Sequence, residues 1–170
     1  MRLEHSWIRY SGKRIKQQNE SLKKDQHDTT HALHDRAHLQ RACKTAMEAI
    51  TDKNDMKQWY FDLAEFKPEV GFKFSFTGGP PERSYLHLCE VIEVIPQKKL
   101  TYSWRYDGYE GVSHVTFELF EETTDTTRLK LAHSGLETFP ALADFARSNF
   151  EAGWSDLIGQ LLKDFVEKRA

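Results

Sequence analysis

Four of the chain's eight histidines, His27, His31, His34 and His38, lie within the stretch HDTTHALHDRAH. On a helix, spacings of four, three and four residues would place these imidazoles along one narrow stripe. Histidines four residues apart can bind one zinc ion, as in HExxH helices, but no glutamate follows His27 here. The stripe would also span about 16 Å, which is too long for four ligands to share one ion. We therefore interpret it as a solvated polar face and expect no metal site.

His133 is a second candidate for chemistry. In the stretch TTRLKLAHS it alternates with Leu129 and Leu131, so it is predicted to face the apolar side of a strand. A buried imidazole can orient a ligand or act as an acid or base. The alternative is a core histidine that is hydrogen-bonded to a neighbour, because buried polar groups generally have partners.

Glu90 is the carboxylate that could join this chemistry. It lies in SYLHLCEVIEVI, a predicted strand that is apolar on both faces, so alternation does not identify its inward face. If Glu90 faces inward, its carboxylate needs a partner such as His133 or Arg105 and is a candidate acid or base. If the other face is inward, Glu90 is solvated and the interior is lined by Tyr85, His87 and Cys89.

A run of strands must position these residues. From residue 70 the apolar residues recur with a period of two, as in GFKFSFT, where Phe72, Phe74 and Phe76 share a face. Asp107-Gly108 is a hairpin signal, and the short links between strands indicate an antiparallel meander. The predicted strands cover residues 71–77, 84–95, 100–106, 112–120 and 126–134.

Helices are predicted on both sides of this run. Residues 33–50 carry apolar side chains at steps of three and four residues, which indicates a helix. A longer helix is predicted to begin at Pro140, since proline is tolerated in a first turn, and to continue to the end of the chain. Its apolar stripe consists of Phe150, Trp154, Leu157, Ile158, Leu161, Leu162 and Phe165. A half-apolar sheet and one long amphipathic helix predict an α+β sandwich.

Composition and charge exclude several classes of protein. The net charge of −2 and the dispersed Lys and Arg residues give no footprint for nucleic acid. Two cysteines are too few for a disulfide framework, so a cytoplasmic location is expected. No stretch approaches the ~20 apolar residues of a membrane span, and the N-terminus lacks the apolar core of a secretory signal. Neither GxSxG nor a glycine-rich phosphate loop occurs, and we expect no cofactor.

The chain divides near residue 45. Residues 11–31 are almost wholly polar, a composition that buries too little apolar surface to offset the entropy of ordering. We therefore expect one domain over residues 45–170, preceded by an atypical polar segment over residues 1–44. Within that segment, HSWIRY at residues 5–10 is a candidate edge strand.

Several sequence blocks stand in the order and spacing of a known superfamily: AMEAITD followed by MKQWYFD, FKPEVGFKFSF, HLCEVIEVIPQKKLTYSWRY, VSHVTFEL, TRLKLAHSGL and NFEAGWSDLIGQLLKDFVE. Over roughly residues 45–168 the chain resembles the START-like (SRPBCC, birch-pollen-allergen) superfamily. Within it, the chain resembles the family homologous to the activator of the heat-shock chaperone ATPase. The resemblance implies a helix-grip fold, in which a curved antiparallel sheet wraps around a long C-terminal helix. Two small helices, near residues 44–52 and 54–60, would follow the first strand. Either HSWIRY supplies that first strand, or the N-terminal forty residues are not typical of the family.

Because the superfamily binds or transforms many unrelated ligands, the resemblance implies only a class of function. The first expectation is binding of a hydrophobic or amphipathic, lipid-like molecule between the sheet and the helix, where abundant aromatic side chains suit an apolar pocket with few polar anchors. The predicted lining residues are Phe74, Phe76, His87, Tyr102, Trp104, Phe117, His133, Trp154 and Ile158. One alternative is a stress-response role as a partner of the ninety-kilodalton heat-shock chaperone. The other is a cyclase- or hydrolase-type enzyme that uses His133, with Glu90 as a second candidate.

Overall fold

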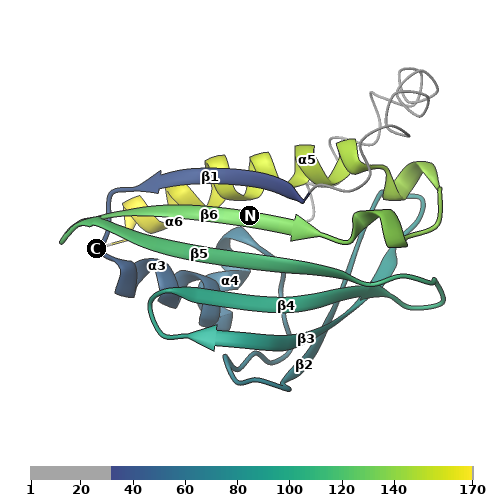
Figure 1. Ribbon diagram of the computed structural model, residues 1–170, viewed down its shortest axis with the longest axis horizontal. Helices are drawn as coiled ribbons and strands as arrows, with labels where there is room; N and C mark the ends of the chain where they lie inside the picture. The colour runs from purple at the N-terminus through teal and green to yellow at the C-terminus, as the bar shows by residue number, and fades with distance from the viewer. Residues whose placement is uncertain (1–31, 170) are drawn as a thin grey trace.

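The curved sheet and the C-terminal helix that it grips are described over residues 32–169 by a computed structural model (Figure 1). Within these residues six strands form one antiparallel sheet in the order β1-β6-β5-β4-β3-β2. The strands are β1 (Leu33–Leu39), β2 (Lys73–Gly78), β3 (Tyr85–Ile95), β4 (Lys99–Tyr106), β5 (Ser113–Thr123) and β6 (Thr126–Ser134). Helices α3, α4 and the C-terminal helix lie on one side of the sheet, behind it in Figure 1. The α+β helix-grip architecture is therefore confirmed.

Strands β2 to β6 follow the predicted meander closely. In β4 the residues Leu100, Tyr102, Trp104 and Tyr106 are all buried, and intervening Arg105 is exposed, as the period of two requires. The hairpin after β4 turns at Gly108, whose φ of 76° lies in the left-handed region that glycine enters without steric cost. The sheet therefore collects its large aromatic side chains on the face that meets the helices.

The predicted helix over residues 33–50 is wrong in its first half, since residues 33–39 form strand β1. The apolar positions Leu33, Ala37 and Leu39 share one face at the period of two but not on a helix, and the edge of β6 offers a hydrogen-bonding partner along the whole segment. Those three side chains are buried, while His34 and His38 point outward. The helical histidine stripe therefore does not exist at these two positions, and His27, His31 and HSWIRY lie outside the described residues.

The two small helices predicted after the first strand are α3 (Cys43–Thr51) and α4 (Lys53–Trp59). Asp52 separates them and begins α4, because its carboxylate accepts hydrogen bonds from the backbone N–H groups of Asn54 (2.9 Å) and Asp55 (3.1 Å). Met47, Ile50, Met56 and other apolar residues of both helices pack into the core.

The C-terminal helix begins at Arg147, seven residues later than the proline-based prediction. The intervening connection holds two short 3-10 turns, η2 (Leu136–Thr138) and η3 (Ala143–Phe145), because Phe139 and Phe145 turn inward onto aromatic side chains of the sheet. The helix then runs as α5 (Arg147–Asp156), a π-helical segment η4 (Leu157–Leu162) and α6 (Lys163–Lys168). In residues 32–169, no helix is long and apolar enough to cross a membrane.

The π-helical segment keeps the inward residues of this helix on one face. The buried residues Phe150, Trp154, Ile158, Leu162 and Val166 recur every four residues. In a continuous α-helix each such step drifts by about 40°, so a stripe of this length would wind away from the sheet. The wider turn of a π-helix compensates for this drift. As a result, Leu162 and Val166 are buried and Leu161 and Phe165 lie at the margin.

Strand β1 provides a test of where the folded domain begins. We expect a chain that lacks residues 1–30 to melt cooperatively, because the described pairings of β1 are made by residues 33–39. A chain that lacks residues 1–40 also loses buried Leu33 and Leu39, each of which contributes roughly 2–5 kcal/mol. Its cooperative transition should be lost or strongly lowered. Calorimetry of both chains checks this, and an equal loss in the shorter deletion would contradict it.

Candidate functional site

The nine predicted lining residues lie together between the sheet and the C-terminal helix, and all of them are buried. Strands β2 to β6 contribute the first seven in chain order, and α5 and η4 contribute Trp154 and Ile158. Their rings touch: the centroids of Phe76 and His87 are 4.4 Å apart, and those of Trp104 and Trp154 are 6.0 Å apart. The alternation in the sequence thus identified a real cluster, which we call the aromatic interior. In this conformation its side chains pack against one another.

His133 is hydrogen-bonded at both ring nitrogens. The indole N–H of Trp154 donates to its Nδ1 at 3.0 Å, so the proton of the neutral ring lies on Nε2. Nε2 donates to Oγ of Ser113 at 2.7 Å, and that hydroxyl donates to the carbonyl oxygen of Trp104 at 3.3 Å. Burial, with a smaller contribution from nearby His114, lowers the pKa of His133 to about 3. This is the geometry of a neutral core histidine, and it leaves neither nitrogen free for acid–base chemistry.

His87 is a second buried neutral histidine. Its Nδ1 lies 3.2 Å from the carbonyl oxygen of Phe76 and 3.1 Å from that of Tyr85, and therefore carries the proton. Burial lowers the pKa of His87 to about 4, and the two carbonyl groups only partly oppose this. The aromatic interior consequently holds two imidazoles and no positive charge on either of them at neutral pH.

Glu90 faces away from this interior. Of the two orientations open at the sequence level, the structure has Tyr85, His87 and Cys89 inward and Glu90 on the outer face of β3. Its side chain is about half exposed, and its nearest cation is Lys73, at 4.0 Å. Glu90 and His133 therefore lie on opposite sides of the sheet, and the proposed acid–base pairing of the two is wrong. The sequence of β3 is apolar on both faces because Leu86, Leu88 and Ile92 line the exposed side of the strand.

Tyr60 was missed by the sequence analysis. It ends α4, and its hydroxyl lies 2.8 Å from that of Tyr102 in a fully buried hydrogen bond. Burial, the largest cause in each case, raises the pKa of both tyrosines far above the usual value, so both hydroxyls stay protonated. The run Trp59-Tyr60-Phe61 was visible in the sequence, but only the tertiary structure indicates which of its rings points inward.

One end of the aromatic interior is closed by the connection between β6 and the C-terminal helix, residues 136–146, which we call the cover segment (Figure 1). From this segment Phe145 stacks on Tyr106, with ring centroids 4.5 Å apart, and Phe139 meets the same ring edge-on at 5.1 Å. Asp144 fastens the segment to the sheet: the hydroxyl of Tyr85 donates to its carboxylate at 2.5 Å, and Arg83 lies 3.3 Å away. Phe139 also stacks on Phe150 of α5, with ring centroids 6.2 Å apart, so the first turns of the long helix take part in this closure.

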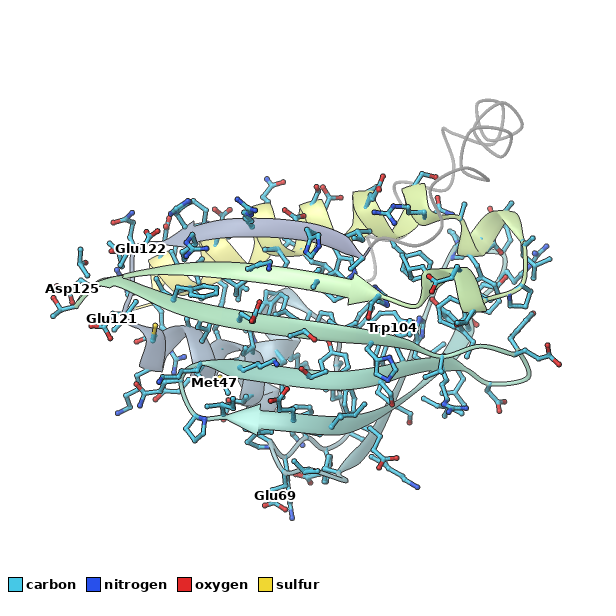
Figure 2. All side chains as sticks on the ribbon, in the orientation of Figure 1. Met47, Glu69, Trp104, Glu121, Glu122 and Asp125 are labelled. Atoms are coloured by element: carbon cyan, nitrogen blue, oxygen red, sulfur yellow. The ribbon has the colours of Figure 1, made fainter. Side chains whose placement is uncertain are left out.

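Trp104 carries an unsatisfied polar atom in the interior. Its side chain is 0% exposed, and its indole N–H has no hydrogen-bond partner among the described residues. The other two described tryptophans differ, because Trp59 donates to the carbonyl oxygen of Ala49 at 2.8 Å and Trp154 donates to His133. Figure 2 shows Trp104 in the half of the molecule nearer the β4–β5 hairpin, whereas Met47 of α3 lies toward the other end.

A shallow groove of about 250 Å³ lies on the surface near Met47, away from the aromatic interior. None of the nine predicted residues lines it; its walls are formed by Lys44, Met47, Glu48, Thr51, Pro68, Val94, Pro96 and Gln97. Within residues 32–169, no three His, Cys, Asp or Glu side chains are grouped so that they could share a metal ion.

Comparison with known proteins gives the family. The family model described as "Activator of Hsp90 ATPase homolog 1-like protein" matches residues 45–167. No curated protein matches the chain.

Among solved structures, the protein MLL2253 of Mesorhizobium loti is 24% identical, with a TM-score of 0.66, covering 82% of this chain and 98% of its own. A protein of Arthrobacter aurescens is 15% identical with a TM-score of 0.68, covering 83% of this chain and 88% of its own. DynU16, a protein of the dynemicin biosynthetic locus, is 21% identical with a TM-score of 0.66, and the match covers 81% of this chain and 48% of DynU16. At these identities the likeness establishes the fold.

The two neutral histidines predict a pH dependence of stability. In the unfolded chain both imidazoles take up a proton below about pH 6.5, whereas in the fold they stay neutral down to about pH 4 (His87) and about pH 3 (His133). The unfolded state therefore binds more protons in this window. As the pH falls from 6.5 to 4, each histidine should lower the free energy of unfolding by up to about 1.4 kcal/mol per pH unit.

Urea denaturation at several pH values measures this slope. His87→Phe should remove about half of the part of this slope that the two buried histidines contribute, because one of the two titrating imidazoles is gone. A slope that is the same in His87→Phe as in the wild type would show that His87 does not stay neutral in the fold.

The Tyr60–Tyr102 hydrogen bond predicts strong coupling between two substitutions. Tyr60→Phe leaves the buried Tyr102 hydroxyl without its partner and should cost roughly 1–3 kcal/mol of unfolding free energy. Tyr102→Phe should cost a similar amount. The double variant has no orphaned hydroxyl, so its loss should be well below the sum of the two single losses. Additive losses in urea denaturation would contradict the pairing.

Proposed function

The chain belongs to the family of proteins like the activator of Hsp90 ATPase homolog 1, and from this premise we propose that it binds a hydrophobic or amphipathic small molecule between the sheet and the C-terminal helix. Binding would take place in the aromatic interior, at the end that the cover segment closes.

The cover segment is the observation that carries this proposal. The two phenylalanines that lie over Tyr106, Phe139 and Phe145, belong to a connection that takes no part in the strand pairings of the sheet. The anchoring contacts of Asp144 are polar and lie at the margin, where Arg83 is exposed. Moving this segment would open the interior without breaking a strand pairing.

The chemistry of the interior favours an apolar ligand. Aromatic side chains from five strands would contact it, and burying apolar surface contributes about 25 cal/mol per Å². With His87 and His133 neutral, nothing in the described cluster compensates a buried charge. The presence of the structurally similar DynU16 in a biosynthetic locus is in keeping with a small organic ligand.

The family description names an activator of a chaperone ATPase, so a chaperone partner is the alternative function. It has a separate readout, the ATPase rate of the purified ninety-kilodalton chaperone with and without this chain. A clear change in that rate, with no uptake of any apolar probe, would favour the alternative. An enzyme that uses His133 lacks support, because both nitrogens of that ring are already bonded.

Entry of a probe past the cover segment tests the proposal. The neutral dye N-phenyl-1-naphthylamine should bind saturably, and its fluorescence should rise several-fold faster with Phe145→Ala, which removes one ring over Tyr106. Phe120→Ala is the control. Phe120 is 37% exposed on the outer face of the sheet, so its substitution should leave the rate unchanged. Absence of saturable binding in the wild type, together with a clean mass in native mass spectrometry of the purified chain, would contradict the proposal.

A further inference from the structure

We propose that the indole N–H of Trp104, together with the neighbouring hydroxyl of Tyr106, is the polar anchor of this site and binds an uncharged carbonyl oxygen of the ligand. The inference rests on the proposed function and goes further by naming the chemical group that the ligand must carry. Its basis is the one buried side-chain N–H in residues 32–169 that has no hydrogen-bond partner. A buried donor left unpaired is destabilising, so its retention requires an explanation.

The potential acceptors around Trp104 do not form a hydrogen bond with its indole N–H. His133 lies beside it, with ring centroids 5.5 Å apart, but Nδ1 of His133 already accepts from Trp154. The ring of His87, 4.9 Å away, meets it edge-on; its Nδ1 donates to backbone carbonyl groups, and its Nε2 does not accept from Trp104. The remaining contacts are apolar faces such as Phe76, at 5.5 Å. The hydrogen bonds of these neighbouring side chains therefore do not include the indole N–H of Trp104.

Tyr106 is the polar neighbour. Burial raises the pKa of Tyr106, and the nearby indole N–H of Trp104 partly opposes this rise. The indole N–H and the hydroxyl nevertheless do not meet the geometry of a hydrogen bond. The hydroxyl stays protonated and can itself donate. An oxygen atom seated between the two side chains would therefore accept two hydrogen bonds, one from each.

The position of this pair suits an entering ligand. Tyr106 packs directly against Phe139 and Phe145, so its side chain lies immediately behind the cover segment. Trp104 comes next along β4 on the same face, against Trp154 of the C-terminal helix. A ligand that displaces the two phenylalanines would bring an aromatic or aliphatic body against these rings and its oxygen to the indole N–H.

Electrostatics select an uncharged oxygen. The side chains that meet the ring of Trp104 are neutral: Phe76, Tyr106, Trp154, and the histidines 87 and 133, whose pKa values burial lowers. A carboxylate or phenolate here would be buried without a positive partner, which is very unfavourable. A ketone, ester or amide carbonyl accepts hydrogen bonds with no net charge. The ligand class is therefore an apolar molecule with a neutral carbonyl group.

Two probes of equal shape test this anchor. 2-Acetylnaphthalene carries a ketone oxygen, and 2-isopropenylnaphthalene has a CH₂ group in its place. Wild-type protein should bind the ketone about tenfold more tightly or better, because only the ketone satisfies the buried donor. In Trp104→Phe this preference should fall several-fold, because only the Tyr106 hydroxyl is left to donate to the ketone oxygen. Trp59→Phe, which also removes a buried indole but one that donates to Ala49, should keep the preference.

Nuclear magnetic resonance of wild-type protein gives a readout that does not depend on the stability of Trp104→Phe. Titration with the ketone should shift the indole N–H signal of Trp104 downfield and leave that of Trp59 in place, while the alkene should produce no downfield shift. Equal binding of both probes would overturn the anchor and leave the proposed function standing. Binding of neither probe while N-phenyl-1-naphthylamine still binds would overturn the anchor alone. Absence of binding of all three compounds, together with a clean mass of the purified chain, would overturn the proposed function and with it the anchor.

Discussion

The hydrogen bond between Trp154 and His133 joins the C-terminal helix to the sheet inside an otherwise apolar interior. Apolar packing alone specifies the rotation of a helix loosely, whereas one buried donor and one buried acceptor must meet to avoid a large penalty. The bond also fixes the tautomer of His133, and through Ser113 it reaches the backbone of β4. The orientation of the helix, the registry of three strands and the position of Trp104 are therefore linked through one polar chain.

This arrangement divides the polar groups of the interior into two kinds. His133, Tyr60 and Tyr102 are paired within the protein and serve its stability. The indole N–H of Trp104 stands apart, in the same aromatic surroundings but without a partner among residues 32–169. A protein under selection for stability alone would gain from losing such a donor, which is why we assign it to recognition.

Much of the fold could be predicted from the sequence, because a sheet with one buried face carries the period of two in its own residues. That period located β2 to β6 and the inward position of Trp104 and His133. The same period was overlooked where a helical pattern follows it directly. In LHDRAHL the apolar residues share a face at the period of two, but the steps of three and four residues that begin at Leu39 led the predicted helix to be extended back over this strand.

The features of the site that could not be predicted depend on tertiary contacts that local sequence patterns do not report. Strand β3 is apolar on both faces, so nothing local indicates on which side Glu90 lies. The start of the C-terminal helix was misplaced because Pro140 satisfies the rule for a first turn, whereas the contacts of Phe139 and Phe145 with Tyr106 hold that stretch out of the helix. The missing partner of Trp104 depends on the rotamers of several neighbouring rings, which no spacing in the sequence reports.

The π-helical segment Leu157–Leu162 takes up one more residue than ordinary α-helix would need to turn through the same angle. Deleting one residue there would allow the segment to relax into ordinary α-helix while the side chains beyond it keep their directions. Val166 would then stay in the core, and Arg169 would still face Glu48 and Asp55 of the small helices. A one-residue insertion has no such compensation and would rotate every later side chain by about 100°. This half of the helix should therefore tolerate the loss of one residue better than the gain of one.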